Sequence, residues 1–263
     1  MSVQKDILQC TFNNRNKIMR NLIVLLAVAL SSSLAISADT AATRMKIEQA
    51  LGGDSRSEAE VARDANRKPA EVLEFFELED DMKVLEISPA TGYWSKFVGP
   101  TLCANGGELL VSVSVSDNYK NGVMNLPGMD CVSAINNAVS LRELPEFSFE
   151  EDNFDLVLTF WNLHNPSAEG RENLNKAVFQ ALKPGGVYGV VDHTRRHMQP
   201  TTRPVGRRLD PVLVVKELLD VGFELADYSD MHYHPEEGLD QEVGTPGVRG
   251  ATDRFTMKFR KPE

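Results

Sequence analysis

Two histidines and an aspartate are the residues of this sequence best suited to acid–base chemistry. His164 lies in the segment FWNLHN (160–165), and Asp192 and His193 end the segment VVDH (190–193). A histidine pKa lies near neutrality, so His164 can take a proton from an acceptor oxygen or nitrogen. We expect Asp192 to orient His193 as an acid–base pair. A histidine that only caps its own loop is an equally open interpretation of His164.

A cluster of arginines follows this pair in a chain that is otherwise acidic. The formal net charge is −10, which argues against a nucleic-acid partner. The segment 195–208 nevertheless holds Arg195, Arg196, Arg203, Arg207 and Arg208. The cluster indicates an anionic substrate or a cofactor carboxylate. The alternative is a solvated loop whose arginines pair with surface acids.

The segment VLEISPATGYWS (84–95) joins an apolar strand to a helix through a tight turn. Glu86 lies at the end of the strand, and Pro89 fixes the turn while removing one N–H donor. The turn holds a single glycine, Gly92, and is interpreted either as a ligand-binding loop or as a plain strand-to-helix connection. No Gly-x-Ser-x-Gly elbow and no Walker loop occur, so neither a serine hydrolase nor a P-loop enzyme is indicated.

Alternating strands and helices position these residues. The apolar segments predict strands over 82–88, 107–115, 129–135, 154–162 and 187–193. Helices are predicted over 45–78, 92–104, 168–183 and 210–223. The first is expected to break at Gly52-Gly53 and Pro69, and the second to be interrupted or ended near Gly99 and Pro100. The third is expected to end at Pro184-Gly185-Gly186.

The pattern defines the fold class. Strands alternating with helices predict an α/β fold, Rossmann-like and doubly wound, with a mainly parallel sheet. ELADYSD and DRFTMKFRK follow one another without a helix, so we expect an antiparallel edge strand. Ligands of such sheets bind at the carboxyl ends of the strands, near the point where strand order reverses. The acid–base residues and the turn both fall at such ends.

The N-terminal residues have the order of a signal peptide. A basic flank, an apolar run from Leu22 to Leu30 and small residues follow one another, so residues 1–38 are expected to be removed after Ala38 or Ala35. Met19 is an alternative start, and an uncleaved anchor is the alternative outcome. The remaining chain, 39–263, is expected to be one domain in the periplasm or secreted.

Two further expectations concern cysteine and metal. Cys103 and Cys131 remain in the mature chain, and we expect two buried free thiols rather than a disulfide. His232 and His234 are expected in a surface loop, and no metal site is indicated.

Three stretches in this order, VLEISPATGYWS, LPEFSFEEDNFDLVLTFWNLHN and ALKPGGVYGVVDH, resemble class I S-adenosylmethionine-dependent methyltransferases. The resemblance covers residues 60–262 and is greatest to a bacterial branch that often carries signal peptides. The family's first turn reads acid-x-Gly-x-Gly-x-Gly. Glu86 holds the acid place, and Ser88, Ala90 and Gly92 hold the glycine places.

The resemblance implies S-adenosylmethionine as cofactor and a small-molecule methyl acceptor. The remaining cofactor-binding residues that it implies are Tyr93, Ser112, Ser114 and Asn162, with Asn136, Asn137 and Ser140 in the region nearest the adenine. The competing hypothesis is an exported, non-catalytic binding protein whose methyltransferase-like fold has lost or changed its cofactor.

Overall fold

The computed structural model describes residues 39–135 and 140–263. One compact unit comprises Thr43–Glu263, and the described residues before it, 39–42, are helical. The predicted signal peptide, Asn136 and Asn137 lie outside the described residues. No helix in the described part of the chain has the length and apolar character needed to cross a membrane.

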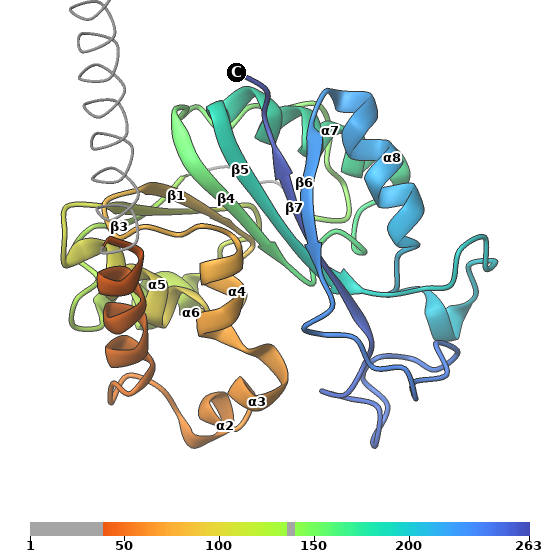
Figure 1. The fold of residues 1–263 in the computed structure, drawn as a ribbon, viewed down its shortest axis with the longest axis horizontal. Helices are drawn as coiled ribbons and strands as arrows, with labels where there is room; N and C mark the ends of the chain where they lie inside the picture. The colour runs from red at the N-terminus through yellow and green to blue at the C-terminus, as the bar shows by residue number, and fades with distance from the viewer. Residues whose placement is uncertain (1–38, 136–139) are drawn as a thin grey trace, which may run out of the picture. The chain divides into compact units, whose positions relative to one another are not determined.

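The helices and strands follow the predicted order (Figure 1). The chain is helical to residue 51. The later elements are α2 (Glu58–Val61), α3 (Asp64–Arg67), α4 (Pro69–Phe75), β1 (Lys83–Ile87), α5 (Ser95–Cys103), β2 (Glu108–Ser112), α6 (Asp117–Gly122), η1 (Val123–Asn125), β3 (Val132–Ala134), β4 (Phe154–Phe160), α7 (Ala168–Ala181), β5 (Leu182–His193), η2 (Arg203–Val205), α8 (Pro211–Val221), β6 (Glu224–Ser229) and β7 (Arg254–Arg260).

The strands form one seven-stranded sheet in the order β3-β2-β1-β4-β5-β7-β6. All pairings from β3 to β5 are parallel, whereas β7 is antiparallel to both of its neighbours. The predicted α/β fold is therefore confirmed, and the antiparallel strand is the second from the edge. Strand order reverses between β1 and β4, which is the point where ligands of such sheets bind.

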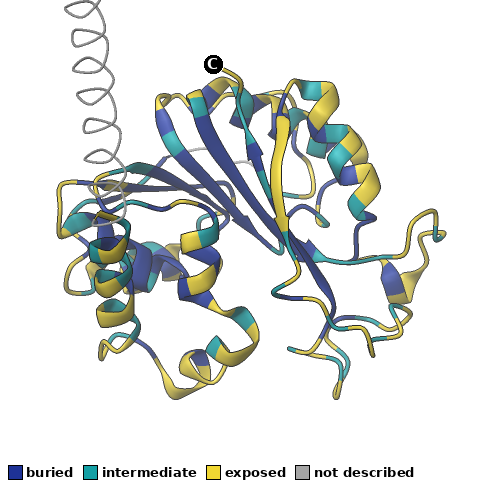
Figure 2. Ribbon diagram, in the orientation of Figure 1, coloured by how far each residue is buried: buried dark blue, intermediate teal, exposed yellow. Residues whose placement is uncertain are grey.

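Helices cover both faces of the sheet because side chains of each strand alternate between faces. Leu85 and Ile87 of β1 pack with α7 and α8, while Val84 packs with α4 and α5. Figure 2 shows β4 and β5 buried along most of their length and β6 exposed. In Figure 1, α2, α3 and the loop before β7 lie at the end of the sheet where β5 finishes.

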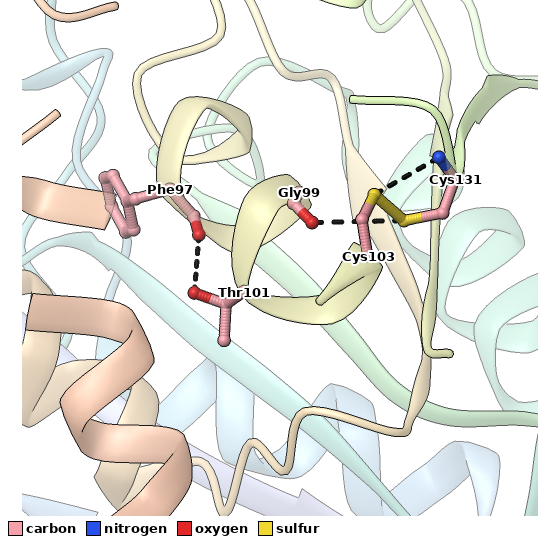
Figure 3. The surroundings of a disulfide bond; sticks show 5 residues. All are labelled: Phe97, Gly99, Thr101, Cys103 and Cys131. Carbon is pink, nitrogen blue, oxygen red and sulfur yellow. Dashed lines mark hydrogen bonds between the residues drawn. A yellow bond between two sulfur atoms is a disulfide. The ribbon is translucent and has the colours of Figure 1, made fainter. Parts of the chain in front are cut away.

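Two helix ends differ from the prediction. Helix α5 continues through Pro100 to Cys103, and the Thr101 hydroxyl donates to the Phe97 carbonyl oxygen at 2.7 Å (Figure 3). Gly99 suits this place because a Cβ there would lie 2.6 Å from the sulfur of Met129. Helix α7 ends at Ala181, before the Pro184-Gly185-Gly186 segment, which belongs to β5 instead. Pro100 therefore does not end its helix, whereas α7 does end shortly before Pro184.

The expectation of two free thiols is wrong in this structure. Cys103 and Cys131 form a disulfide, with their Cα atoms 5.3 Å apart (Figure 3). The bridge joins the last residue of α5 to the residue before β3. The two cysteines are 28 residues apart in the sequence, so no local pattern indicates that they are close. It fixes the helix that follows the β1 turn to the sheet.

Candidate functional site

The turn after β1 has the backbone of a glycine loop although only one glycine is present. Ser88, Ala90 and Gly92 have φ angles of 52°, 50° and 77°, all in the left-handed region. These are the positions that correspond to glycine in the pattern that the sequence resembles. Left-handed backbone costs an L-residue roughly 1–2 kcal/mol. At Gly92 a side chain is also excluded, because a Cβ would lie 2.7 Å from Val123.

Two neighbouring strands end in the same way. Val113 and Ser114, directly after β2, have φ angles of 61° and 54°, and Trp161, directly after β4, has 57°. Such a conformation is rare for a β-branched or bulky residue. Backbone strain of this kind gathers at functional sites. The carboxyl ends of β1, β2 and β4 therefore define the candidate site.

Asn162 joins the turns on the two sides of the switch point. Its amide nitrogen donates to the carbonyl oxygens of Ile87 and Ser88, at 3.0 and 3.2 Å. The side chain is buried. We predicted that Asn162 would bind a ligand; its amide nitrogen instead fixes the β1 turn against the β4 turn.

His164 and Asp192 form the acid–base pair of the site. Nδ1 of His164 lies 2.6 Å from Oδ1 of Asp192, and the backbone N–H of His164 donates to Oδ2 at 3.1 Å. Both side chains are nearly inaccessible to solvent, at 5% and 0% exposure. Burial acts to raise the pKa of Asp192, but the histidines beside it hold that pKa below its ordinary value. An ionised Asp192 accepts only, so Nδ1 carries a proton, and in the neutral form of the imidazole Nε2 is the acceptor.

The predicted pairing of Asp192 with the His193 ring is wrong. Only the backbone N–H of His193 donates to Asp192 Oδ1, at 2.7 Å, while its ring Nδ1 lies 2.9 Å from the hydroxyl of Thr252. Burial lowers the pKa of His193 to about 3. Consecutive strand residues point to opposite faces, so a strand aspartate orients a partner from the neighbouring turn more readily than the next residue.

Glu86 lies beneath the β1 turn. Its carboxylate is fully buried and accepts a hydrogen bond from the hydroxyl of Ser95 in α5. Burial raises the pKa of Glu86 to about 7, which the Ser95 hydrogen bond offsets only in part. The acid at this place therefore contacts the helix behind the turn.

Ser112 and Ser114 lie at the end of β2, as predicted for ribose-binding residues. The carbonyl oxygen of the buried Ser112 accepts the Ser88 N–H at 2.7 Å, which connects the β1 and β2 ends. The exposed Ser114 hydroxyl accepts the N–H of Leu141 at 3.2 Å. Both residues border the candidate site.

Arg67 reaches the site and was not predicted. Its Cζ lies 4.1 Å from the ring centroid of Tyr93 and 4.3 Å from that of Trp161. The Tyr93 hydroxyl donates to Asp64 at 2.5 Å. No sequence signal marks Arg67 as different from the other basic residues of the helical segment 45–78. Its place depends on tertiary contacts alone.

His232 helps to hold Arg67 in place. It is buried rather than in the predicted surface loop, with Nδ1 2.7 Å from the Thr256 hydroxyl and Nε2 3.1 Å from the carbonyl oxygen of Arg67. Burial lowers the pKa of His232 to about 4, so the ring is neutral and donates from Nε2.

The arginines of 195–208 are largely engaged within the protein. Arg207 pairs with Glu242, and the fully buried Arg208 pairs with Glu237 at 2.8 Å. Arg196 donates to the carbonyl oxygen of Gly238 at 3.0 Å. The alternative interpretation, solvated arginines paired with surface acids, therefore describes Arg207, whereas Arg208 forms a buried pair that neither interpretation predicted.

Comparison with known proteins finds similarity in fold. No protein-family model matches the chain, and neither does a curated protein. The [4+2]-cyclase SpnF is 20% identical, with a TM-score of 0.56 over 80% of this chain and 85% of that one. An S-adenosylmethionine-dependent methyltransferase from Aquifex aeolicus is 16% identical, with a TM-score of 0.54 over 82% and 97%. Human N-acetylserotonin methyltransferase, solved with S-adenosylmethionine, is 13% identical, with a TM-score of 0.51 over 78% and 54%.

These similarities establish the class of fold. The chain has the Rossmann-like fold found in S-adenosylmethionine-dependent methyltransferases. A cyclase shares the fold, so the reaction has to be argued from the site itself.

Proposed function

We propose that this protein is an S-adenosylmethionine-dependent methyltransferase that acts on a small molecule. The observation that carries the proposal is the left-handed backbone at Ser88, Ala90 and Gly92, at the point where strand order reverses. In such a turn the backbone can approach a ligand closely, because no side chain lies between them. Left-handed residues also occur singly in other turns, such as Glu77 and Glu150, but here three alternate positions of one turn share this conformation at the switch point.

The residues present fit this cofactor. Ala90 and Thr91 are exposed at the apex of the turn, and the Ser114 hydroxyl at the end of β2 suits a ribose hydroxyl. The rings of Tyr93 and Trp161 hold the guanidinium of Arg67, so this part of the site presents a positive charge of the protein's own. When bound, S-adenosylmethionine supplies an electrophilic methyl group.

His164 is the general base of the proposed reaction. With Nδ1 donating to Asp192, Nε2 is free to take the proton that an acceptor oxygen or nitrogen loses as it is methylated. The Asp192 carboxylate then stabilises the imidazolium that forms. A positioned base contributes about 10²–10⁴-fold to a rate, and alignment of the reactants contributes the rest.

The proposed place of action is outside the cytosol, in the periplasm or the medium. The signal-peptide order of residues 1–38 and the disulfide between Cys103 and Cys131 both support an oxidising compartment. N-terminal sequencing of the protein isolated from its host tests this proposal. A chain that begins near Asp39 supports export, and an intact N-terminus in the cytosol contradicts it.

Calorimetric titration with S-adenosylmethionine and S-adenosylhomocysteine tests the proposed function. We expect a Kd near micromolar, about −8 kcal/mol. Ala90→Val places a β-branched side chain at a φ of 50° and is expected to weaken binding, whereas Ala104→Val, at an exposed residue with a φ of −70° outside the turn, leaves it unchanged. Absence of binding by the folded wild-type protein would overturn the proposal and leave the non-catalytic binding protein as the better hypothesis.

A further inference from the structure

We propose that Arg67 is an anion-binding residue that holds a ligand carboxylate beside the rings of Tyr93 and Trp161. The inference deepens the proposed function and rests on it for the identity of the ligand. It is based on the Arg67 guanidinium, which packs against two aromatic rings and has no hydrogen-bond acceptor among the described residues.

Arg67 contacts aromatic rings and no carboxylate. Its Cζ lies over the rings of Tyr93 and Trp161, at 4.1 and 4.3 Å from their centroids. Among the described residues, none accepts a hydrogen bond from this guanidinium or forms an ion pair with it. Cation–π contacts satisfy the charge in part, but they leave the five N–H donors unfilled.

The charges around Arg67 do not supply the missing acceptor. Asp64 is an acid whose charge acts on Arg67, and its carboxylate already accepts from Arg56 and from the Tyr93 hydroxyl. Arg63 and Arg254 add positive charge. Burial, followed by these cations, lowers the pKa of Arg67 to about 10, although Tyr93 and Asp64 oppose the shift. A partly buried cation beside other cations is costly unless an anion compensates it.

A second unfilled donor lies on the same aromatic ring. Nε1 of Trp161 is buried and donates to no residue in the described part of the chain. Indole N–H and guanidinium are both donors without acceptor capacity, so the complementary group is an acceptor. The planar guanidinium favours a carboxylate, which it can bind through two parallel hydrogen bonds.

The backbone that carries Arg67 is fixed from the other end of the chain. Arg254 donates to the carbonyl oxygen of Asn66 at 2.6 Å, and His232 contacts that of Arg67 at 3.1 Å. Lys68 donates to the Met231 carbonyl oxygen at 2.5 Å. These bonds fix the backbone that carries the side chain, and the two rings limit the positions of the guanidinium, which together lower the ordering cost of binding.

The carboxylate has two possible sources, the amino-acid part of S-adenosylmethionine and the methyl acceptor. Three probes separate them. S-adenosylhomocysteine carries the amino-acid carboxylate, 5′-methylthioadenosine lacks it, and benzoate presents a carboxylate without a nucleoside. Titrations of the full chain in low-chloride buffer are followed by calorimetry and by the fluorescence of the two tryptophans, Trp94 and Trp161, whose rings lie 6.1 Å apart.

Arg67→Gln is compared with Arg63→Gln, its exposed neighbour on the same segment. We expect Arg67→Gln to weaken the binding of a carboxylate probe at least tenfold and to leave the binding of 5′-methylthioadenosine unchanged. Arg63→Gln removes a nearby charge but not the guanidinium beside the rings, so it should weaken carboxylate binding far less. If Arg67→Gln weakens the binding of S-adenosylhomocysteine, the site belongs to the cofactor. If it weakens the binding of benzoate alone, the site belongs to the acceptor. Arg67→Lys, which keeps the charge, serves as a milder variant and is expected to show an intermediate loss.

Two outcomes separate this inference from the proposed function. If the wild type binds both nucleosides and Arg67→Gln matches Arg63→Gln for every probe, the anion site is wrong and the cofactor proposal stands. If the wild type binds benzoate through Arg67 but neither nucleoside, the anion site stands and the cofactor proposal fails. Binding of none of the probes overturns both.

Discussion

Nδ1 of His164 lies 2.6 Å from Oδ1 of Asp192, and the backbone N–H of the same histidine binds Oδ2 of that carboxylate. One buried aspartate therefore holds both the ring and the main chain of His164. Because His164 follows β4 and Asp192 lies in β5, the pair also joins two neighbouring strands at their carboxyl ends.

Substitution of this pair should abolish most of the activity. His164→Gln removes the base, and we expect a fall in kcat of about 10²–10⁴-fold with an acceptor that must lose a proton. His193→Gln is the comparison variant, since its ring Nδ1 contacts the Thr252 hydroxyl and only its backbone N–H donates to Asp192, and it should lose far less. Methyl transfer from labelled S-adenosylmethionine gives the rates. Equal losses in the two variants would contradict the assignment of the base.

Ala90→Gly should stabilise the protein. Glycine relieves the cost of a φ of 50° at this position, and part of that gain is lost to the greater freedom of the unfolded chain, leaving about 0.5–1 kcal/mol. Thr91→Gly, one residue further on, has no left-handed backbone to relieve and should destabilise. Urea unfolding of both variants measures the difference. Destabilisation by Ala90→Gly would show that the turn does not hold this conformation in solution.

Glu86→Gln should make the protein more stable at alkaline pH. Burial raises the pKa of Glu86 from 4.5 to about 7, so between these values the folded state binds more protons than the unfolded state. Stability from this group therefore falls as pH rises from about 4.5 to about 7, by on the order of 3 kcal/mol, and is then level.

The difference in Tm between Glu86→Gln and the wild type, measured at pH 5 and at pH 8, isolates this group from the buried histidines. We expect little difference at pH 5 and a higher Tm of the variant at pH 8. The same difference at both values would mean that Glu86 is ionised in the folded protein throughout.

Reduction of the disulfide should loosen α5. Closing a loop of 28 residues stabilises the folded state by about 3–4 kcal/mol in the chain-entropy description. The Cys103→Ser/Cys131→Ser double variant should unfold at lower urea concentration by that amount, and reductant should affect the wild type only. Thiol titration of the oxidised full chain should find one free cysteine, Cys10, of the three. Three free thiols would contradict the bridge.

The periodicity of the sequence was sufficient to predict the sheet. Apolar segments and amphipathic helices place β1, β4 and β5 within a few residues of their observed bounds, because burial on both faces leaves a continuous apolar signal. Helix ends were less predictable. Pro100 lies inside α5, where Gly99 allows close packing against Met129 and the Thr101 hydroxyl donates to the Phe97 carbonyl oxygen, and periodicity reveals neither contact.

The candidate site was predicted in its location and not in its pairings. Asp192 was identified, but its ring partner proved to be His164 from the next turn rather than the adjacent His193. Arg67 was missed because a basic residue in a short polar helix has no local mark. Contacts between segments far apart in the chain determine which side chains pair in the site. No local pattern in a single sequence indicates these contacts.

The segment that carries Arg67 is fastened by His232 and Arg254, which lie 165 and 188 residues further along the chain from the carbonyl groups that they bind. The order of synthesis therefore matters. A ribosome has made α3, the β1 turn, His164 and Asp192 long before it makes β7, and until then the backbone at Asn66 and Arg67 lacks the hydrogen bonds from His232 and Arg254. A nascent or C-terminally truncated chain can form most of the sheet and still lack the anion site, so this part of the site matures only with the final strand.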